Sequence, residues 1–302
     1  MKNFVIIGAA GYIAPRHMKA IRDTGNRLVA AFDIHDSVGI LDSYFPEADF
    51  FTEFERFDRH CEKLRRQGTK IDYVVVCSPN YLHDAHVRFG LRIDADVICE
   101  KPLVLNPWNA AALQEMEAET GRKVYVMHQL RYHPAVVALK EQIDSMPGSH
   151  RFTVSLKYVT ARGHWYRHSW KGNPDKSGGL LSNIGIHFFD LFNWLFGASQ
   201  DLTIQQWHPE HTSGRMVTNR ADIDWELSID ANDLPASTRE EGKKVYRQLL
   251  VDNQAADFSE HTTDLHTIAY QAIENGKGCR LAEAAASVDL VYRYKQLAAT
   301  CK

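Results

Sequence analysis

The sequence predicts an α/β protein: an N-terminal doubly wound parallel sheet, then a C-terminal α+β domain built on an open, mostly antiparallel sheet. Three observations predict this class. Strands and helices alternate over the first 127 residues, and these strands are almost continuously apolar, as in parallel sheets covered on both faces. Beyond about residue 150, strands that alternate apolar and polar residues follow one another without helices between them. A chain of 302 residues is also long for a single core.

The first domain is predicted over residues 1–127, and a local sequence pattern predicts each of its strands and helices. Short apolar runs predict strands, amphipathic stretches predict helices, and Gly25 and Pro79 are breakers that follow an element. The predicted strands are residues 4–7, 27–32, 72–77, 95–99 and 123–127, and the predicted helices are residues 15–24, 54–68, 81–91 and 107–120.

The second domain is predicted over residues 128–302. Its strands are expected at residues 152–160, 201–207, 216–219, 223–229 and 244–251. A helix is predicted over residues 180–196, ended by Gly197, and a last helix over residues 281–299. The polar stretch 233–242 is predicted to be a loop.

The composition excludes several classes of protein. With 44% hydrophobic residues, 24% charged residues and a net charge of −3, the chain is typical of globular proteins, and neither a nucleic-acid nor a membrane partner is expected. No apolar run reaches the length of a membrane span. The first strand begins too early for a signal peptide, so a cytoplasmic location is expected. The five cysteines are scattered, without metal-site spacing, so neither a disulfide framework nor a metal is predicted.

Residues 8–14 predict a nucleotide site because a turn of small residues stands between a strand and a helix. Gly8, Gly11, Tyr12 and Ile13 belong to a GxxGxxA variant of the dinucleotide fingerprint, which lets the backbone approach a pyrophosphate. Asp33 ends the next strand, 22 residues after Gly11, where a carboxylate holds the ribose hydroxyls and repels a 2′-phosphate. NAD is therefore predicted rather than NADP; the alternative is that Asp33 is only a turn or helix-cap residue.

A second candidate site follows the strand at residues 95–99. Glu100 and Lys101 are charged residues at the carboxyl end of a buried strand, where ligands bind in open α/β sheets, and Pro102 stiffens the turn. The alternative is an ordinary turn with a solvated lysine.

Taken together, the motifs resemble those of the Gfo/Idh/MocA oxidoreductase family. They resemble most closely the branch of WlbA/WbpB-type UDP-N-acetylglucosaminuronate 3-dehydrogenases. The family motifs are residues 8–14 with Arg16 and His17, residues 78–83, Glu100-Lys101-Pro102 and residues 178–190; the branch is indicated by residues 8–21, 42–46, 100–108 and 165–172.

The resemblance implies a Rossmann domain that binds NAD and a C-terminal domain that binds substrate and forms a homodimer or homotetramer. It also implies a nicotinamide between the domains. The cofactor-binding residues implied by the motifs, besides those of the glycine turn and Asp33, are Ser78, Pro79, Asn80, His83, Glu100 and Lys101.

The implied reaction needs a base that removes a proton from a secondary alcohol, and Lys101 and His187 are the two candidates. The sequence leaves open which of them is the base. Asn183 stands one helical turn before His187, where many relatives have an aspartate, and it can orient a substrate hydroxyl. The alternative for His187 is a core histidine. Asp190 is predicted to be a structural partner of an arginine or the backbone.

The resemblance further implies oxidation at C3 of UDP-N-acetylglucosaminuronate, in bacterial lipopolysaccharide O-antigen synthesis, with 2-oxoglutarate as the oxidant of NADH in some relatives. Such a substrate is anionic, and arginine suits carboxylates and phosphates. The residues predicted to bind it, with Asn183, are Arg131, Tyr132, Arg162, Arg167 and Lys171. The alternative for the basic, aromatic segment 162–171 is a contact with a neighbouring subunit.

Two other functions remain open at the level of sequence. One is an NAD-dependent dehydrogenase of a free polyol or monosaccharide, such as inositol. The other is an NAD-binding sensor without turnover, although Lys101 and His187 are both present.

Overall fold

A computed structural model describes residues 1–258 and 264–300. The chain forms two compact units. The first unit consists of Met1–Gln129 together with Asp264–Ala285, and the second consists of the described residues of Leu130–Thr263 and Ala286–Lys302. The sequence prediction places residues 264–285 in the second domain, whereas the structure places them in the first unit. Of the five cysteines, Cys301 lies outside the described residues; the other four are free and buried.

The first unit is built on a six-stranded parallel sheet in the order β3-β2-β1-β4-β5-β6. Its strands are fully apolar where they are buried, as in the run Val74-Val75-Val76. The order reverses next to β1, so the carboxyl ends of β1 and β4 flank the switch point where ligands bind in such sheets. The strands are β1 (Asn3–Ile7), β2 (Arg27–Phe32), β3 (Asp49–Phe51), β4 (Tyr73–Val76), β5 (Asp96–Cys99) and β6 (Val124–Val126).

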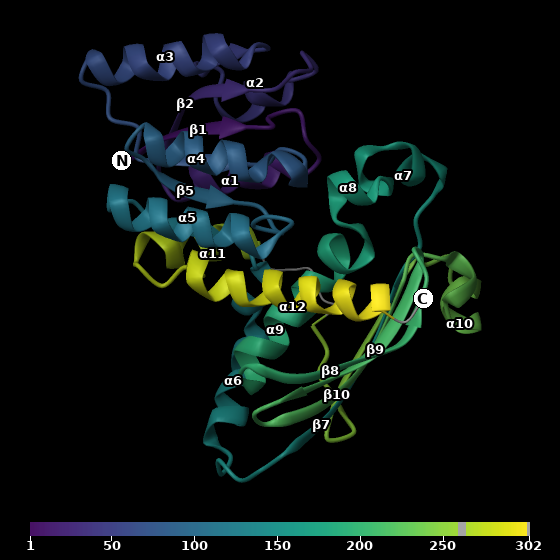
Figure 1. The fold of residues 1–302 in the computed structure, drawn as a ribbon. Coiled ribbons are helices and arrows are strands. Elements are labelled where there is room, and N and C mark those ends of the chain that lie inside the picture. Colours follow the sequence, from purple (N-terminus) through teal and green to yellow (C-terminus); the bar gives the residue numbers. More distant parts are fainter. Residues whose placement is uncertain (259–263, 301–302) are drawn as a thin grey trace. The chain divides into compact units, whose positions relative to one another are not determined.

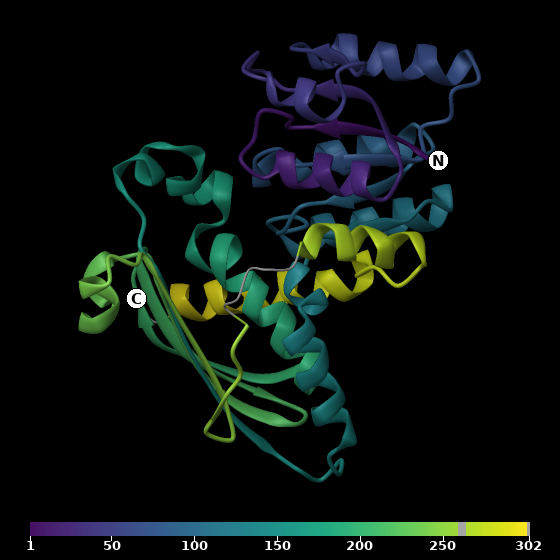
Figure 2. The same cartoon turned by 180° about the vertical axis from the view of Figure 1, so that it is seen from behind.

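Helices cover both faces of this sheet. Figures 1 and 2 show α1 (Ala14–Asp23) and α11 (Leu265–Glu274) on one face, where the ring of Tyr270 stacks on Phe4, and α4 (His83–Arg92) and α5 (Pro107–Thr120) on the other. Gly90 lets α4 approach closely, since a Cβ there would lie 2.5 Å from a methyl of Val97. The remaining helices are α2 (Ile40–Tyr44), α3 (Phe54–Arg66) and the 3-10 turn Asn80–Leu82.

The second unit contains a six-stranded mixed sheet in the order β12-β11-β7-β10-β9-β8. Only β7 and β10 are parallel; the other neighbours are antiparallel. The predicted strands are present, several of them longer than expected. They are β7 (Phe152–Thr160), β8 (Ser199–Trp207), β9 (His211–Thr218), β10 (Ala221–Ser228), β11 (Val245–Val251) and β12 (Gln254–Ala255).

One face of this sheet packs on α9 (Ile186–Phe196) and on the second-unit part of α12 (Leu281–Thr300). The contact is aromatic: the rings of Phe189, Trp225 and Tyr294 meet, and Trp225 Nε1 donates to Tyr294 Oη over 2.8 Å. The core therefore lies between these helices and the sheet.

Two helical details differ from the sequence prediction. The single helix expected over residues 180–196 begins as a π-helical segment, Leu181–Gly185, before α9 continues it. The stretch 233–242, expected as a loop, contains α10 (Ala236–Glu240). The other helices are α6 (Pro134–Ser145), α7 (His164–His168) and α8 (Pro174–Ser177). In the part of the chain that the structure describes, no helix is long and apolar enough to cross a membrane.

Candidate active site

The glycine turn after β1 has a backbone that only glycine tolerates at its first position. Gly8 has φ +91°, and a Cβ there would lie 2.6 Å from the carbonyl carbon of Cys77. The Asp33 carboxylate fixes the turn from the next strand, because its Oδ2 accepts a hydrogen bond from the Ala10 N–H over 2.9 Å. Its Oδ1 accepts from the His35 N–H over 2.9 Å.

This turn fits a dinucleotide phosphate. Among the described residues, the backbone N–H groups of Tyr12 and Ile13 make no backbone hydrogen bond, and they stand just before α1. Two adjacent free amides at a helix N-terminus form an anion site. Asp33 is a turn residue, as the alternative prediction held, and its position at the end of β2 is also that of a ribose-binding carboxylate.

The loop after β4 is tied to the loop after β5 by a histidine. His83 is buried, its Nδ1 lies 2.7 Å from the Pro102 carbonyl oxygen, and its Nε2 lies 2.9 Å from the Ser78 carbonyl oxygen. Burial lowers the pKa of His83, and a neutral imidazole has one N–H, so the ring lies between the two carbonyls and donates to one of them. Asn80 is buried in the same loop, and the Ser78 hydroxyl contacts His86 Nδ1 over 2.8 Å. His83 thus shapes these predicted cofactor loops.

Glu100 points into the first unit, where two histidines hold it. Its Oε1 lies 2.9 Å from His17 Nε2 and 3.5 Å from His266 Nε2. His17 Nδ1 lies 2.8 Å from Tyr270 Oη, so a neutral His17 can donate to Glu100 and accept from the phenol. Burial alone would raise the pKa of Glu100, but the hydrogen bonds from His17 and His266 outweigh it and keep the pKa well below its usual range.

The same three side chains are the one group among the described residues whose types and distances would suit a metal ion, with ligand atoms within 4.8 Å of one another. The carboxylate of Glu100 is already paired with His17 over 2.9 Å, and the longer distance of 3.5 Å to His266 Nε2 completes a carboxylate between two imidazoles. The arrangement anchors Glu100, and Lys101 follows it directly as a partly exposed residue at the carboxyl end of β5.

In the second unit, Asn183 and His187 share one face of the helical segment before and within α9. They are the only residues of 181–192 that are not buried. Asn183 Nδ2 donates to Tyr166 Oη over 2.8 Å, which fixes the amide. Gly185 lies against the sheet, since a Cβ there would lie 2.8 Å from Leu227 Cδ1. The predicted pair is therefore presented together on the open side of an otherwise buried helix.

Arg131 is committed to an ion pair. Its Nε and Nη2 each donate over 2.8 Å to the carboxylate of Asp190, and both side chains are buried. The prediction that Asp190 is a structural partner of an arginine is confirmed. Arg131 thus fastens the turn Gln129–Tyr132, and with it Tyr132, to α9.

A cavity of about 450 Å³ in the second unit collects several predicted residues. Arg167 and Lys171 line it together with Tyr166 and Gly178. Arg167 donates to both oxygens of Glu210, over 2.6 and 3.0 Å. The Lys171 ammonium lies 5.5 Å from the ring centre of Trp165, and burial lowers the pKa of Lys171. Arg162 is exposed and lies over the Tyr166 ring.

Lys295 also lines this cavity, and sequence reasoning missed it. It donates to Ser182 Oγ over 3.0 Å. A signal was present: Lys295 lies four residues after Val291 and three before Ala298, on the buried stripe of α12. A lysine at a core-facing helical position is rare without a function or a partner.

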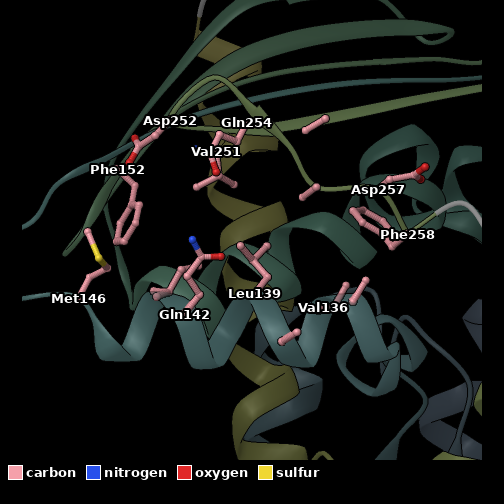
Figure 3. Close-up of a pocket in the computed structure, with 15 residues that line it drawn as sticks. Val136, Leu139, Gln142, Met146, Phe152, Val251, Asp252, Gln254, Asp257 and Phe258 are labelled. Atoms are coloured by element: carbon pink, nitrogen blue, oxygen red, sulfur yellow. The ribbon is translucent and has the colours of Figure 1, made fainter.

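A second cavity of about 450 Å³ lies between α6 and the β11–β12 hairpin (Figure 3). Its lining is mostly apolar, with Leu139, Phe152 and Phe258 among the residues drawn, and it contains none of the predicted site residues. The cation-lined cavity is therefore the better candidate for a polar ligand.

Solved structures are similar to almost the whole chain. The WlbA (WbpB) dehydrogenase of Thermus thermophilus, solved in complex with NAD and α-ketoglutarate, is 47% identical, with a TM-score of 0.92 over 95% of this chain and 93% of that one. The same dehydrogenase in complex with NAD and UDP-GlcNAcA is 46% identical, with a TM-score of 0.93 over 96% and 94% of the two chains.

Curated relatives match less of the chain. The protein YteT of Bacillus subtilis (strain 168) is 30% identical over 214 residues, which are 67% of this chain and 48% of YteT. An inositol 2-dehydrogenase of Rhizobium meliloti (strain 1021) is 26% identical over 202 residues, 65% of this chain and 55% of that protein. The chain spans about half the length of these relatives.

Two family models match in the expected order. Residues 2–128 match the oxidoreductase family with an NAD-binding Rossmann fold, and residues 148–219 match the C-terminal alpha/beta domain of the same family. The resemblance stated from the motifs is confirmed. The chain belongs to the Gfo/Idh/MocA family of NAD-dependent oxidoreductases.

Proposed function

We propose that this protein oxidises the C3 hydroxyl of UDP-N-acetylglucosaminuronate to the 3-keto sugar, as a step in the synthesis of a bacterial surface polysaccharide. The observation that carries the proposal is the match to a dehydrogenase solved with NAD and UDP-GlcNAcA, at 46% identity over 96% of this chain. The cation-lined cavity of the second unit supports it, because this substrate bears two phosphates and a carboxylate.

Lys101 and His187 are the proposed catalytic residues. Oxidation breaks the C3–H bond and the O–H bond of the hydroxyl group on C3. The hydride from C3 and the proton from the hydroxyl group go to different acceptors. NAD, when bound, supplies the hydride acceptor. Lys101 and His187 hydrogen-bond the C3 hydroxyl, and one of them takes its proton. Asn183, fixed by Tyr166, orients the hydroxyl or its neighbour.

The other predicted residues take supporting roles in this proposal. Residues 1–127 hold NAD through the turn 8–13, Asp33, the loop 78–83 and Glu100. Residues 128–302 hold the substrate, with Arg162, Arg167 and Lys171 as cations near it. Arg131 positions α9 through Asp190, and Tyr132 follows on the same turn.

Three further properties belong to the proposal. 2-Oxoglutarate would reoxidise the bound NADH, because the similar dehydrogenase was solved with NAD and α-ketoglutarate. The sheet of the second unit would form the contact of a homodimer or homotetramer, because only one residue of the edge strand β8 is buried and every second residue of β9 is not buried. A cytoplasmic location would suit an enzyme that uses NAD and a nucleotide sugar.

A nicotinamide absorbance assay on the full chain tests the reaction. We expect NAD to be reduced when UDP-N-acetylglucosaminuronate is added, and reduction with UDP-N-acetylglucosamine, which lacks the sugar carboxylate, to be weak or absent. Myo-inositol and glucose serve as competing substrates. Turnover of a neutral polyol without turnover of either nucleotide sugar would show a dehydrogenase of free polyols or monosaccharides instead. NAD binding without reduction by any of these substrates would favour an NAD-binding sensor.

A further inference from the structure

Two ammonium groups share the cavity of the second unit. Lys171 and Lys295 both line it, although they are far apart in sequence and come from different elements, the 3-10 turn Trp170–Gly172 and α12. Both residues are only partly exposed. The cavity volume of about 450 Å³ lies within the range of small-molecule sites.

Neither ammonium group is neutralised within the described part of the chain. No carboxylate there forms an ion pair with Lys171 or Lys295, and the pKa of each is lowered, in both cases mainly by burial. For Lys295 burial is the only cause, and it lowers the pKa to about 8. A buried charge without a partner is costly, so its retention points to a ligand of opposite charge.

The contacts of Lys295 leave room for such a ligand. Its hydrogen bond goes to Ser182 Oγ, a neutral acceptor, whereas an ammonium group has three donors. Ser182 directly precedes Asn183, so the ammonium group lies beside the segment that presents Asn183 and His187. The cavity that Lys295 lines also contains Leu180 and Leu181, which directly precede this segment.

The acidic residues of the cavity do not cancel its cations. Arg167, Lys171 and Lys295 line it with two carboxylates, Asp175 and Glu210. Glu210 accepts hydrogen bonds from two nitrogens of Arg167, Nε and Nη2. Asp175 is exposed in the short helix α8. The wall around the two lysines therefore keeps a positive charge.

We propose that Lys295, together with Lys171, binds an anionic group of the substrate, either a carboxylate or a phosphate, and so makes the enzyme specific for an anionic sugar derivative. The inference rests on the proposed function and adds a specificity-determining residue to it. A neutral sugar would leave both partly buried ammonium groups without an anionic partner, which disfavours its binding.

Calorimetric titration of the NAD-loaded full chain tests the role of Lys295. UDP-N-acetylglucosaminuronate and UDP-N-acetylglucosamine are titrated into the wild type, Lys295→Met, Lys295→Arg and the control Lys243→Met. Lys243 is exposed and paired with Glu241. Loss of a charged hydrogen bond predicts a Kd for Lys295→Met that is roughly ten- to hundredfold higher. Lys295→Arg keeps the charge and retains most of the affinity, and Lys243→Met matches the wild type.

The two ligands distinguish the source of the anion. If Lys295 binds the sugar carboxylate, only the affinity for the acid falls in Lys295→Met; if it binds a phosphate, the affinity falls equally for both ligands. Either result supports the inference. A folded Lys295→Met protein that binds both ligands as the wild type does would overturn it.

A labelling experiment on the wild type separates this inference from the proposed function. An amine-reactive reagent at pH 8 modifies Lys295, and mass spectrometry measures its extent against the exposed Lys277. If the wild type binds neither nucleotide sugar, the proposed function fails, and inorganic pyrophosphate and acetate become the probes. Protection of Lys295 but not of Lys277 by either anion still supports an anion site. Equal labelling with and without both anions would overturn it.

Discussion

At the scale of single residues, burial and hydrogen bonds together set the pKa values of the groups in the proposed sites. Burial lowers the pKa of Lys295 to about 8, and the hydrogen bonds of two histidines keep Glu100 ionised beside Lys101. The described part of the second unit thus carries cations without a paired carboxylate, and the first unit carries a carboxylate that two histidines already hold. We therefore expect pH to act on binding through Lys295, and substitutions of Lys295 and Lys101 to have different effects.

Substrate affinity should depend on pH through Lys295. Its ammonium form predominates below about pH 8 and is lost above it. Affinity for the anionic substrate should therefore fall, by up to about tenfold for each pH unit above 8. Lys295→Arg should reduce this dependence, because arginine stays charged and only Lys171, whose pKa burial also lowers, still titrates. Calorimetry between pH 7 and pH 9.5 measures it, and a wild type as flat as the arginine variant would contradict the assignment.

Lys295 should also lower the free energy of unfolding of the protein. Its folded pKa of about 8 lies below the unfolded value of 10.5, so the unfolded chain binds more protons between these values and stability rises with pH there. Below pH 8 the full cost is present. Lys295→Met should therefore raise the free energy of unfolding at pH 7 by about 1–3 kcal/mol. The loss of the hydrogen bond to Ser182 makes this gain smaller. Urea denaturation measures it; clear destabilisation would indicate a structural role instead.

Lys101→Met should remove catalysis and keep the cofactor. A proton acceptor contributes roughly 10²- to 10⁴-fold to the rate, so kcat should fall by that factor. The turn at Gly8 and Asp33 is left intact, so Lys101→Met should raise the Kd for NAD, measured by fluorescence titration, less than Gly8→Ala does. His187→Asn should lower kcat in the same way. Full turnover in both variants would remove them from the proposed chemistry.

At the scale of elements, the proposed functional residues lie in turns and at the starts of helices more than in the regular parts of strands and helices. The turn after β1 is held by Gly8, Asp33 and two free amides before α1, while α9 begins with a π-helical segment. π-helical turns are often found at functional sites. Here the segment places Asn183 and His187 on one open face.

Gly8→Ala should weaken NAD binding more than a similar change at another turn. A Cβ at Gly8 would lie 2.6 Å from the Cys77 backbone, so the turn must shift. Gly25→Ala is the matched control: Gly25 has φ +73°, but a Cβ there meets nothing within 4 Å. Both variants should lose roughly 1 kcal/mol of stability or more, but only Gly8→Ala should raise the Kd for NAD, by about tenfold or more. Equal NAD affinities would contradict the role of this turn.

At the scale of the whole molecule, acid should destabilise the protein through its first unit. His17, His83 and His86 are buried there, and burial lowers the pKa of each, for His86 to about 4. The unfolded histidines take up protons below pH 6.5 while the folded ones do not, so stability falls as the pH falls from 6.5 towards 4.

The contribution of His86 should be about 2 kcal/mol between pH 7 and pH 5. Urea denaturation at the two values measures the loss, and His86→Gln should reduce it, because glutamine does not titrate. A loss of the same size in wild type and variant would assign the acid sensitivity to other groups.

Much of this molecule follows from local sequence patterns. Strand β7 is predicted at its observed limits because polar and apolar residues alternate over it, and the parallel sheet follows from its apolar runs. Lys295 and the anchors of Glu100 were not predicted, because they depend on contacts between distant segments. His17 and His266 are 249 positions apart, and only the packing of α1 on α11 brings them to one carboxylate.

The most direct test of the central claim is to follow the hydrogen on C3. The full chain with NAD is given UDP-N-acetylglucosaminuronate that carries deuterium at C3, and mass spectrometry examines the NADH and the sugar. The proposed function predicts NADH with one deuterium, a 3-keto nucleotide sugar without it, and neither product from Lys101→Met. Unlabelled NADH, or no reduction by a protein that binds both ligands, would contradict it.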